Sequence, residues 1–148
     1  MAAVRDPRFE SRVRESFQRQ QFMSLLGASL ARVAPGEVDI ELPFSPRLTQ
    51  QHGFVHAGAL ASILDSACGY AASTLMDADA AVLTIEFKVN LLEPGVGDRF
   101  VARARVVRAG RTVTVCRGEA VAAGDGGEKL VAIVTATIMT VRERGIRA

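Results

Sequence analysis

The segment that most restricts the fold of this chain runs from Ala57 to Met76, is largely apolar, and carries one charged side chain, Asp65. A helix over this segment would be apolar on every face, so the rest of the protein must enclose it. A membrane is a poorer enclosure, because an Asp at the centre of a membrane-spanning helix costs roughly 2.5–3.5 kcal/mol. The sequence therefore predicts a central helix over residues 57–76 in which Asp65 is buried.

Short strands are predicted on both sides of this helix, because apolar and polar residues alternate there. In the clearest case, one face of a strand would carry Leu83, Ile85, Phe87, Val89 and Leu91. The predicted strands span residues 28–33, 37–42, 83–91, 99–108, 111–123 and 129–141. Short turns rich in Gly and Pro connect most of them, which indicates antiparallel neighbours.

The first residues have the pattern of an amphipathic helix over residues 7–24. Phe9, Val13 and Phe17 recur at four-residue spacing, and an Asp-Pro pair at the start is typical of a helix cap and first turn. Gly27 is a suitable residue to end the helix.

The order of these elements is helix, two strands, long helix and four strands, which favours an α+β fold. We expect an antiparallel curved sheet wrapped around one long central helix, with the N-terminal helix as an addition. Residues 1–148 are expected to form this single domain. An open sheet face or edge would require a second subunit, so a homodimer or homotetramer is also expected.

Composition narrows the possible partners. The net charge of +2 is too weak to indicate nucleic-acid binding. The chain starts without the basic and apolar regions of a signal peptide, which predicts a cytoplasmic protein with no membrane attachment. Cys68 and Cys116 lie in apolar stretches and are expected in the core. His52 and His56 have no third metal ligand nearby, so no metal and no other cofactor is expected.

The candidate chemistry lies between Gln50 and Asp65. An acid in apolar surroundings is costly, so Asp65 either is held by structural hydrogen bonds or acts on a reacting carbonyl group. The first-turn amides that follow His56 could donate hydrogen bonds to a developing oxyanion. About two helical turns separate them from Asp65, so a second subunit would have to supply one half of such a site.

The run Gln50-Gln51-His52-Gly53-Phe54-Val55-His56-Ala57-Gly58-Ala59-Leu60, followed by Leu64-Asp65-Ser66-Ala67, resembles the signature of hotdog-fold acyl-CoA thioesterases of the phenylacetate-pathway (PaaI-like) branch. The stretch from Thr84 to Pro94 is similar to the next strand and turn of that family. The resemblance covers most of the chain after the N-terminal helix. It implies a hotdog fold, an acyl-CoA substrate and an active site at a dimer interface.

The resemblance also implies roles for individual residues. Asp65 would be the nucleophile or the general base, and the Ala57 amide would polarise the thioester carbonyl. Gln50, where the family usually has Asn, would hold water or the carbonyl. Thr84 would orient the reacting groups, and His56 would organise the loop. The residues expected to contact the substrate are Gly58, Phe54, Val55 and Leu60, the last three lining a tunnel for the acyl group.

The sequence departs from the family pattern at Ala57, which replaces the first Gly of a Gly-Gly pair. A positive φ at this position would be strained for Ala. Two other functions stay open. One is a hotdog dehydratase acting on enoyl or hydroxyacyl thioesters, and the other is a non-catalytic acyl-CoA-binding module.

Overall fold

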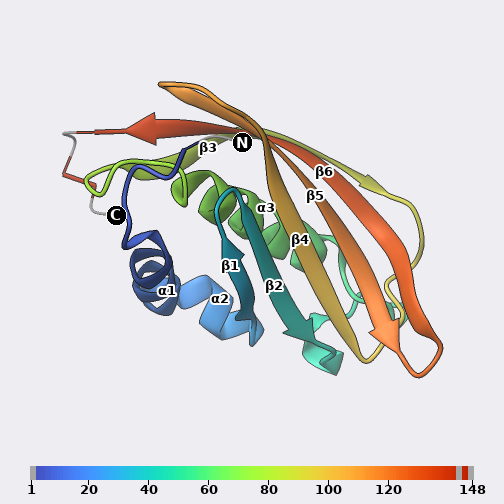
Figure 1. The fold of residues 1–148 in the computed structure, drawn as a ribbon. Helices are drawn as coiled ribbons and strands as arrows, with labels where there is room; N and C mark the ends of the chain where they lie inside the picture. The colour runs from blue at the N-terminus through green and yellow to red at the C-terminus, as the bar shows by residue number, and fades with distance from the viewer. Residues whose placement is uncertain (1–2, 143–144, 147–148) are drawn as a thin grey trace.

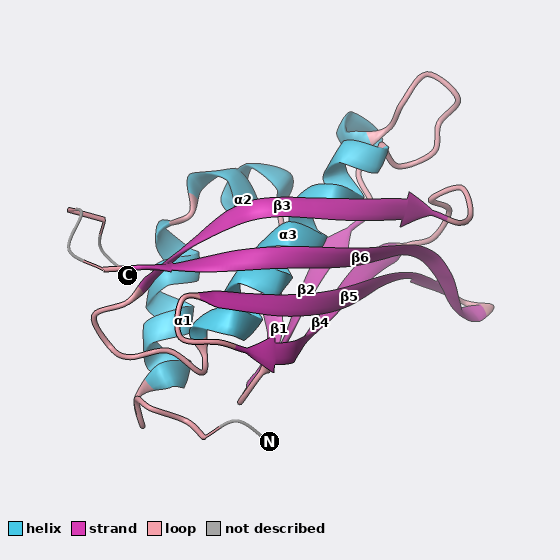
Figure 2. Cartoon of the chain, turned by 90° about the horizontal axis from the view of Figure 1, so that it is seen from above, coloured by secondary structure: helices cyan, strands magenta, loops and turns pink. Residues whose placement is uncertain are grey.

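The computed structural model describes residues 3–142 and 145–146. The helices are α1 (Phe9–Arg19), α2 (Gln21–Leu26) and α3 (Ala57–Ser73), with a short 3-10 helix, η1 (Pro46–Leu48). The strands are β1 (Ser29–Ala34), β2 (Glu37–Pro43), β3 (Ala81–Leu91), β4 (Arg99–Ala109), β5 (Val113–Gly124) and β6 (Gly127–Val141). They form one antiparallel sheet in the order β1-β2-β4-β5-β6-β3, which curves around α3 (Figures 1 and 2).

The six predicted strands are confirmed, with ends that differ from the prediction by at most two residues. The predicted central helix is confirmed from Ala57 but ends at Ser73, before Met76. The amide nitrogens of Leu75 and Met76 bond to carbonyls three residues back, so the chain tightens into turns there. No helix among the described residues is both long and apolar enough to cross a membrane.

The core forms where the inner face of the sheet meets α3. Ile63, Leu64 and Ala67 are completely buried in it. Cys68 and Cys116 are also completely buried and unpaired, and the Cys116 thiol donates to the carbonyl oxygen of Cys68 at 3.4 Å. Their predicted place in the core is therefore confirmed.

The prediction of one continuous helix over residues 7–24 is wrong at Gln20. This residue has ψ of 96°, an extended conformation, and so separates α1 from α2. Its side-chain oxygen accepts a hydrogen bond from Ser66 of α3 at 3.1 Å, a contact to a distant helix that local sequence patterns do not contain. Gly27 ends α2 with φ of 79°, as predicted.

The start of α1 also lies later than the sequence indicates. Arg8 occupies the position before the first helical residue, so Asp6 is not the helix cap. The Asp6 carboxylate instead accepts hydrogen bonds from the Arg8 amide at 3.0 Å and from Nε of Arg12 at 2.9 Å. These bonds, the Arg8 amide first, hold the pKa of Asp6 below its ordinary value although burial opposes the shift.

Strand β3 is an edge strand, and a bulge at Ile85 changes which side chains face α3. Directly opposed residues of antiparallel strands share a face. Thr84 lies opposite Ile138 and Phe87 opposite Ala136, both on the buried face, and the register shifts between Thr84 and Glu86. The prediction that the apolar residues of 83–91 all share one face is therefore wrong for the part of the strand before the bulge. Leu83 and Ile85 lie on the exposed part of the strand, 49% and 56% accessible.

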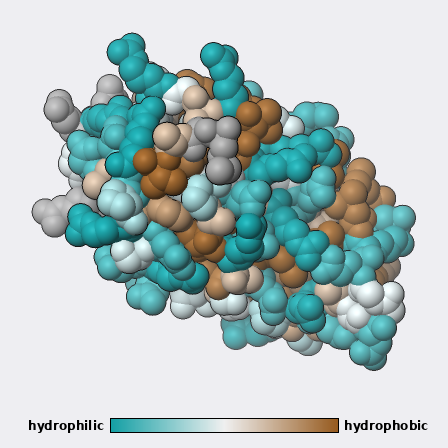
Figure 3. Space-filling view, viewed as in Figure 1, coloured by the Kyte–Doolittle hydropathy of each residue, from teal (hydrophilic) through white to brown (hydrophobic). Residues whose placement is uncertain are grey.

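The outer face of the sheet is charged, because charged residues alternate with buried ones along its strands. They include Arg32, Asp39, Arg103, Arg117 and Glu119. In the view of Figure 3, hydrophilic side chains cover most of the molecule and apolar ones form separate clusters. A charged face is suited to water rather than to another sheet.

Candidate active site

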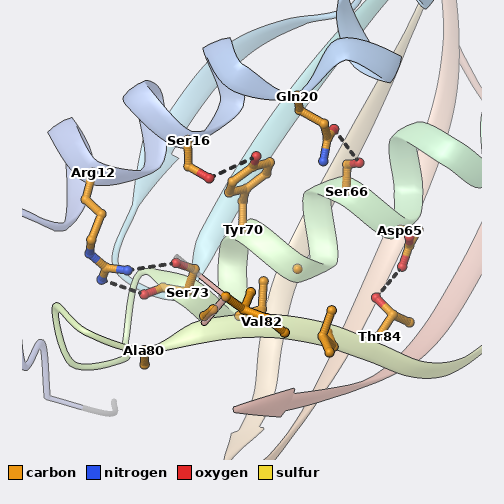
Figure 4. Close-up of a pocket in the computed structure, with 14 residues that line it drawn as sticks. Arg12, Ser16, Gln20, Asp65, Ser66, Tyr70, Ser73, Ala80, Val82 and Thr84 are labelled. Atoms are coloured by element: carbon orange, nitrogen blue, oxygen red, sulfur yellow. Dashed lines mark hydrogen bonds between the residues drawn. The ribbon is translucent and has the colours of Figure 1, made fainter. Parts of the chain in front are cut away.

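Asp65 lies near the middle of α3, on the side that faces β3. The hydroxyl of Thr84 donates to its Oδ1 at 2.7 Å, as Figure 4 shows. The prediction that Asp65 is buried is wrong for the single chain, because the side chain is partly exposed. The sheet ends at β3, so no further strand covers this side of the helix. Among the described residues, no hydrogen bond reaches its second oxygen, Oδ2.

A pocket of about 360 Å³ opens beside this carboxylate. In Figure 4, side chains of the N-terminal helical segment face α3 across it, and β3 borders the other side. Ser16 and Tyr70 approach each other there at 3.4 Å, and Gln20 meets Ser66. Local sequence patterns do not identify Ser16, Gln20 or Tyr70 as candidates, because the four-residue pattern of the first helix gives no sign of the break at Gln20.

The neighbouring thiol of Cys68 does not compete with Asp65 as a nucleophile. Cys68 lies one helical turn further along α3 and is completely buried. Burial raises the pKa of the Cys68 thiol, and the Asp65 charge raises it further, so the reactive thiolate is not formed at neutral pH.

The residue before α3 accepts hydrogen bonds from three of the four amides in the first turn of the helix. His56 precedes the helix, and its Nδ1 accepts a hydrogen bond from the Gly58 amide at 2.8 Å. The carbonyl oxygen of His56 accepts from the Ala59 and Leu60 amides. Among the described residues, the Ala57 amide has no acceptor. Ala57 is itself part of the helix, so its backbone is not strained by a positive φ.

The loop before α3 is organised by its own backbone. Gln50 pairs with Phe54 and Gly53 through main-chain hydrogen bonds, and its side-chain oxygen accepts from the His52 amide. The Gln50 side-chain amide nitrogen can still donate. Gly53 has φ of 85°, which favours glycine at this turn.

A second pocket, of about 540 Å³, lies at this loop. Gln50, Phe54, His56, Ala57 and the end of β3 line it, as do Val55 and Leu60. Phe54 is 36% exposed, whereas Val55 and Leu60 are almost completely buried and form its floor. Gly58 lies next to this pocket.

The two pockets have no residue in common, so a single chain does not bring Asp65 and the Ala57 amide together. One pocket contains Asp65 and the other contains Ala57, so each holds one half of the active site predicted from the sequence. Within residues 3–142 and 145–146, no three side chains of the metal-binding types are grouped.

The combination of a curved antiparallel sheet and an enclosed helix is shared with known proteins. A crystal structure of a thioesterase family protein from Silicibacter pomeroyi is 51% identical, with a TM-score of 0.90 over 91% of this chain and 99% of that chain. A structure of a phenylacetic acid degradation-related protein from Ralstonia eutropha is 26% identical, with a TM-score of 0.76 over 88% and 98% of the two chains.

A sequence relative from Halobacterium salinarum, whose name assigns it a provisional esterase activity, is 35% identical over 70% of this chain and 71% of its own length. The model of the Thioesterase superfamily matches residues 52–129, more than half of the chain. The fold is thus the hotdog fold of thioester hydrolases, as the resemblance implied. This chain belongs to the Thioesterase superfamily and is an enzyme of the thioester hydrolase class.

Proposed function

We propose that the protein hydrolyses acyl-CoA thioesters to a free acid and CoA. The observation that carries the proposal is the Asp65 carboxylate, which Thr84 holds at 2.7 Å beside a pocket while Oδ2 faces no protein donor among the described residues. Its neighbour Ser66 is engaged with Gln20, and Ser62 with the Gly58 carbonyl, so neither hydroxyl bonds to Asp65. This arrangement supports a reacting carboxylate over a structural one.

The proposed chemistry uses groups from two subunits. The Ala57 amide donates to the thioester oxygen and stabilises the negative charge that develops there. Asp65 either removes a proton from the attacking water or attacks the carbonyl carbon itself. In both cases the C–S bond breaks, the thiolate of CoA leaves and takes up a proton, and water supplies the second oxygen of the acid. Gln50 and Thr84 hold the water, carbonyl and carboxylate in place.

A homodimer through β3 would complete the site. Thr84 lies near the start of β3, and the loop pocket borders its end at Leu91. If two β3 strands pair in antiparallel fashion, the start of each strand lies beside the end of the other. Asp65 of one chain would then face the loop pocket and Ala57 amide of its partner. The exposed apolar side chains of this edge support such pairing.

A thiol-release assay with short, long and aromatic acyl-CoAs tests the function. Asp65→Asn should lower kcat/KM by roughly 100- to 10,000-fold, the usual contribution of a general base. Asp79→Asn, the same change at an exposed acid after α3, should leave kcat/KM unchanged. Full activity of Asp65→Asn would remove this residue from the chemistry.

The same assay separates the other candidate functions. Binding of acyl-CoA without release of thiol would favour the binding module, and hydration of an enoyl-CoA would favour the dehydratase. The single domain over residues 1–148 and the cytoplasmic location stay predictions.

A further inference from the structure

The inference concerns the acyl group and rests on the proposed function. The pocket beside Asp65 has a volume of about 360 Å³, near the lower limit of ligand pockets at about 300 Å³. CoA is large and carries several phosphate charges, which require free cations. Arg12 is the cation among the described lining residues. The hydrogen bonds of Arg12 therefore bear on which end of the substrate this pocket can accept. The Arg19 charge also acts on Tyr70, from outside the described lining.

Four of the five N–H donors of Arg12 bond to groups within the protein. Its Nε donates to Asp6 at 2.9 Å, and its other nitrogens donate to the Ser73 hydroxyl, the Ser73 carbonyl and the Met76 carbonyl at 3.0–3.2 Å. Asp6 is 5% exposed and neutralises the guanidinium charge. Arg12 therefore fastens α1 to the end of α3 and offers no charge to a phosphate or to a carboxylate on the acyl group.

The neutral polar groups of this pocket are less fully engaged. The oxygens of Ser16 and Tyr70 are 3.4 Å apart, longer than the 2.5–3.0 Å of a normal hydroxyl hydrogen bond. Gln20 uses its oxygen for Ser66, and its side-chain amide nitrogen carries two donor hydrogens. Burial raises the pKa of Tyr70, so its hydroxyl is neutral at physiological pH. These neutral groups can form hydrogen bonds with an uncharged ligand.

We propose that Ser16, Gln20 and Tyr70 recognise an uncharged hydrogen-bonding substituent, such as a hydroxyl, on a short acyl group in the Asp65 pocket. Tyr70 is five residues beyond Asp65, about 7.5 Å along the helix, so the substituent lies several carbons from the carbonyl. The pantetheine arm of CoA then passes along the partner's loop pocket. In this arrangement Phe54, Val55 and Leu60 contact that arm, and they do not line an acyl tunnel.

Three thioesters of matched chain length test this specificity. The kcat/KM of ω-hydroxyhexanoyl-CoA should exceed that of hexanoyl-CoA about 2- to 10-fold, the effect of one or two net hydrogen bonds. Adipoyl-CoA, with a carboxylate at the same end, should be the poorest of the three. Equal rates for the first two would overturn the inference but not the thioesterase function, whereas no release of thiol from any thioester would contradict the function itself.

Two pocket variants test which residues recognise the substituent on the acyl group. Tyr70→Phe and Ser16→Ala should both reduce the ratio of kcat/KM between ω-hydroxyhexanoyl-CoA and hexanoyl-CoA toward one. Ser11→Ala makes the same change as Ser16→Ala on the exposed side of α1, where Ser11 bonds to the Arg8 carbonyl, and should leave the ratio at its wild-type value. An unchanged ratio in both pocket variants would overturn the assignment.

Gly69→Ala tests which end of the substrate occupies the pocket. A Cβ at Gly69 would lie 3.8 Å from Val82, an ordinary contact, so the methyl group narrows the pocket without a clash. This variant should lower kcat/KM for hexanoyl-CoA several-fold more than for acetyl-CoA. An equal loss for both would place the CoA end here and overturn the inference, as would no loss for either.

Discussion

His56 and Gly58 together determine which amide of α3 is free. The His56 ring occupies the Gly58 amide, and the His56 carbonyl occupies the next two, so the Ala57 amide is left to bind a substrate oxygen. A Cβ at Gly58 would lie 2.9 Å from Nδ1 of His56. Glycine is needed at this position because the imidazole approaches its backbone closely.

Gly58→Ala should therefore reduce activity with little change in stability. The His56 ring must move, which costs roughly 1 kcal/mol of helix capping, while Ala gains about 0.5–1 kcal/mol over Gly in a helix. The displaced turn should lower kcat/KM by roughly 10- to 100-fold, less than loss of an oxyanion donor, because the amide moves but is retained. Thermal unfolding and the thiol-release assay measure the two effects.

Gly69→Ala is the matched control for stability. It makes the same change in the same helix where a Cβ has room, so it should raise the melting temperature. A Gly58→Ala protein that is as active as the wild type would show that the His56 cap does not position the Ala57 amide.

At the scale of elements, one ion pair contributes to the attachment of the N-terminal helix to α3. Arg12 links Asp6 to the last turn of α3, and the pKa of Asp6 is lowered in the folded protein. A carboxyl group with a lowered pKa stabilises the fold above its ordinary value of 3.8 and loses this contribution as the pH falls through the lowered pKa.

Asp6→Asn should accordingly lower the melting temperature at neutral pH, and the difference from wild type should shrink as the pH falls below 3.8. Melting curves recorded across this range measure the effect. Asp125→Asn makes the same change at an exposed turn and should leave the melting temperature at neutral pH at its wild-type value. A difference between Asp6→Asn and wild type that stays constant at all pH values would assign the loss to packing and not to charge.

The sequence predicted most elements and missed two interruptions within them. The alternation of apolar and polar residues located all six strands, and the apolar segment located α3. The break at Gln20 depends on Ser66, a contact across 46 positions, and the bulge at Ile85 depends on pairing with β6. Local periodicity does not contain such contacts. The residue pattern identified Asp65 and the first-turn amides of α3, and the resemblance added Thr84 and the role of the Ala57 amide. Ser16 and Tyr70 became candidates only through the fold.

At the scale of the whole molecule, the proposed dimer makes β3 both an edge and a part of the active site. Ile85→Lys places a charge on this edge, and charged edge residues oppose strand pairing. The variant should be a folded monomer by light scattering and circular dichroism, and it should lose hydrolysis although Asp65 is unchanged.

Val107→Lys provides the comparison. Val107 is 63% exposed on β4, away from the proposed interface, so the same change should leave a dimer with normal kcat/KM. An active Ile85→Lys monomer would show that one chain contains the complete site.

The extra residue of the β3 bulge determines which side chains of the strand face α3. Thr84 faces α3 before it and Phe87 faces α3 after it, whereas a strand without the bulge could turn only one of them inward. Deletion of a single residue here would turn the side chains along half of the strand to the opposite face. The residues used for chemistry and those used for assembly would then change places. Insertions and deletions in β3 should for this reason be tolerated far less during divergence than substitutions at its exposed positions.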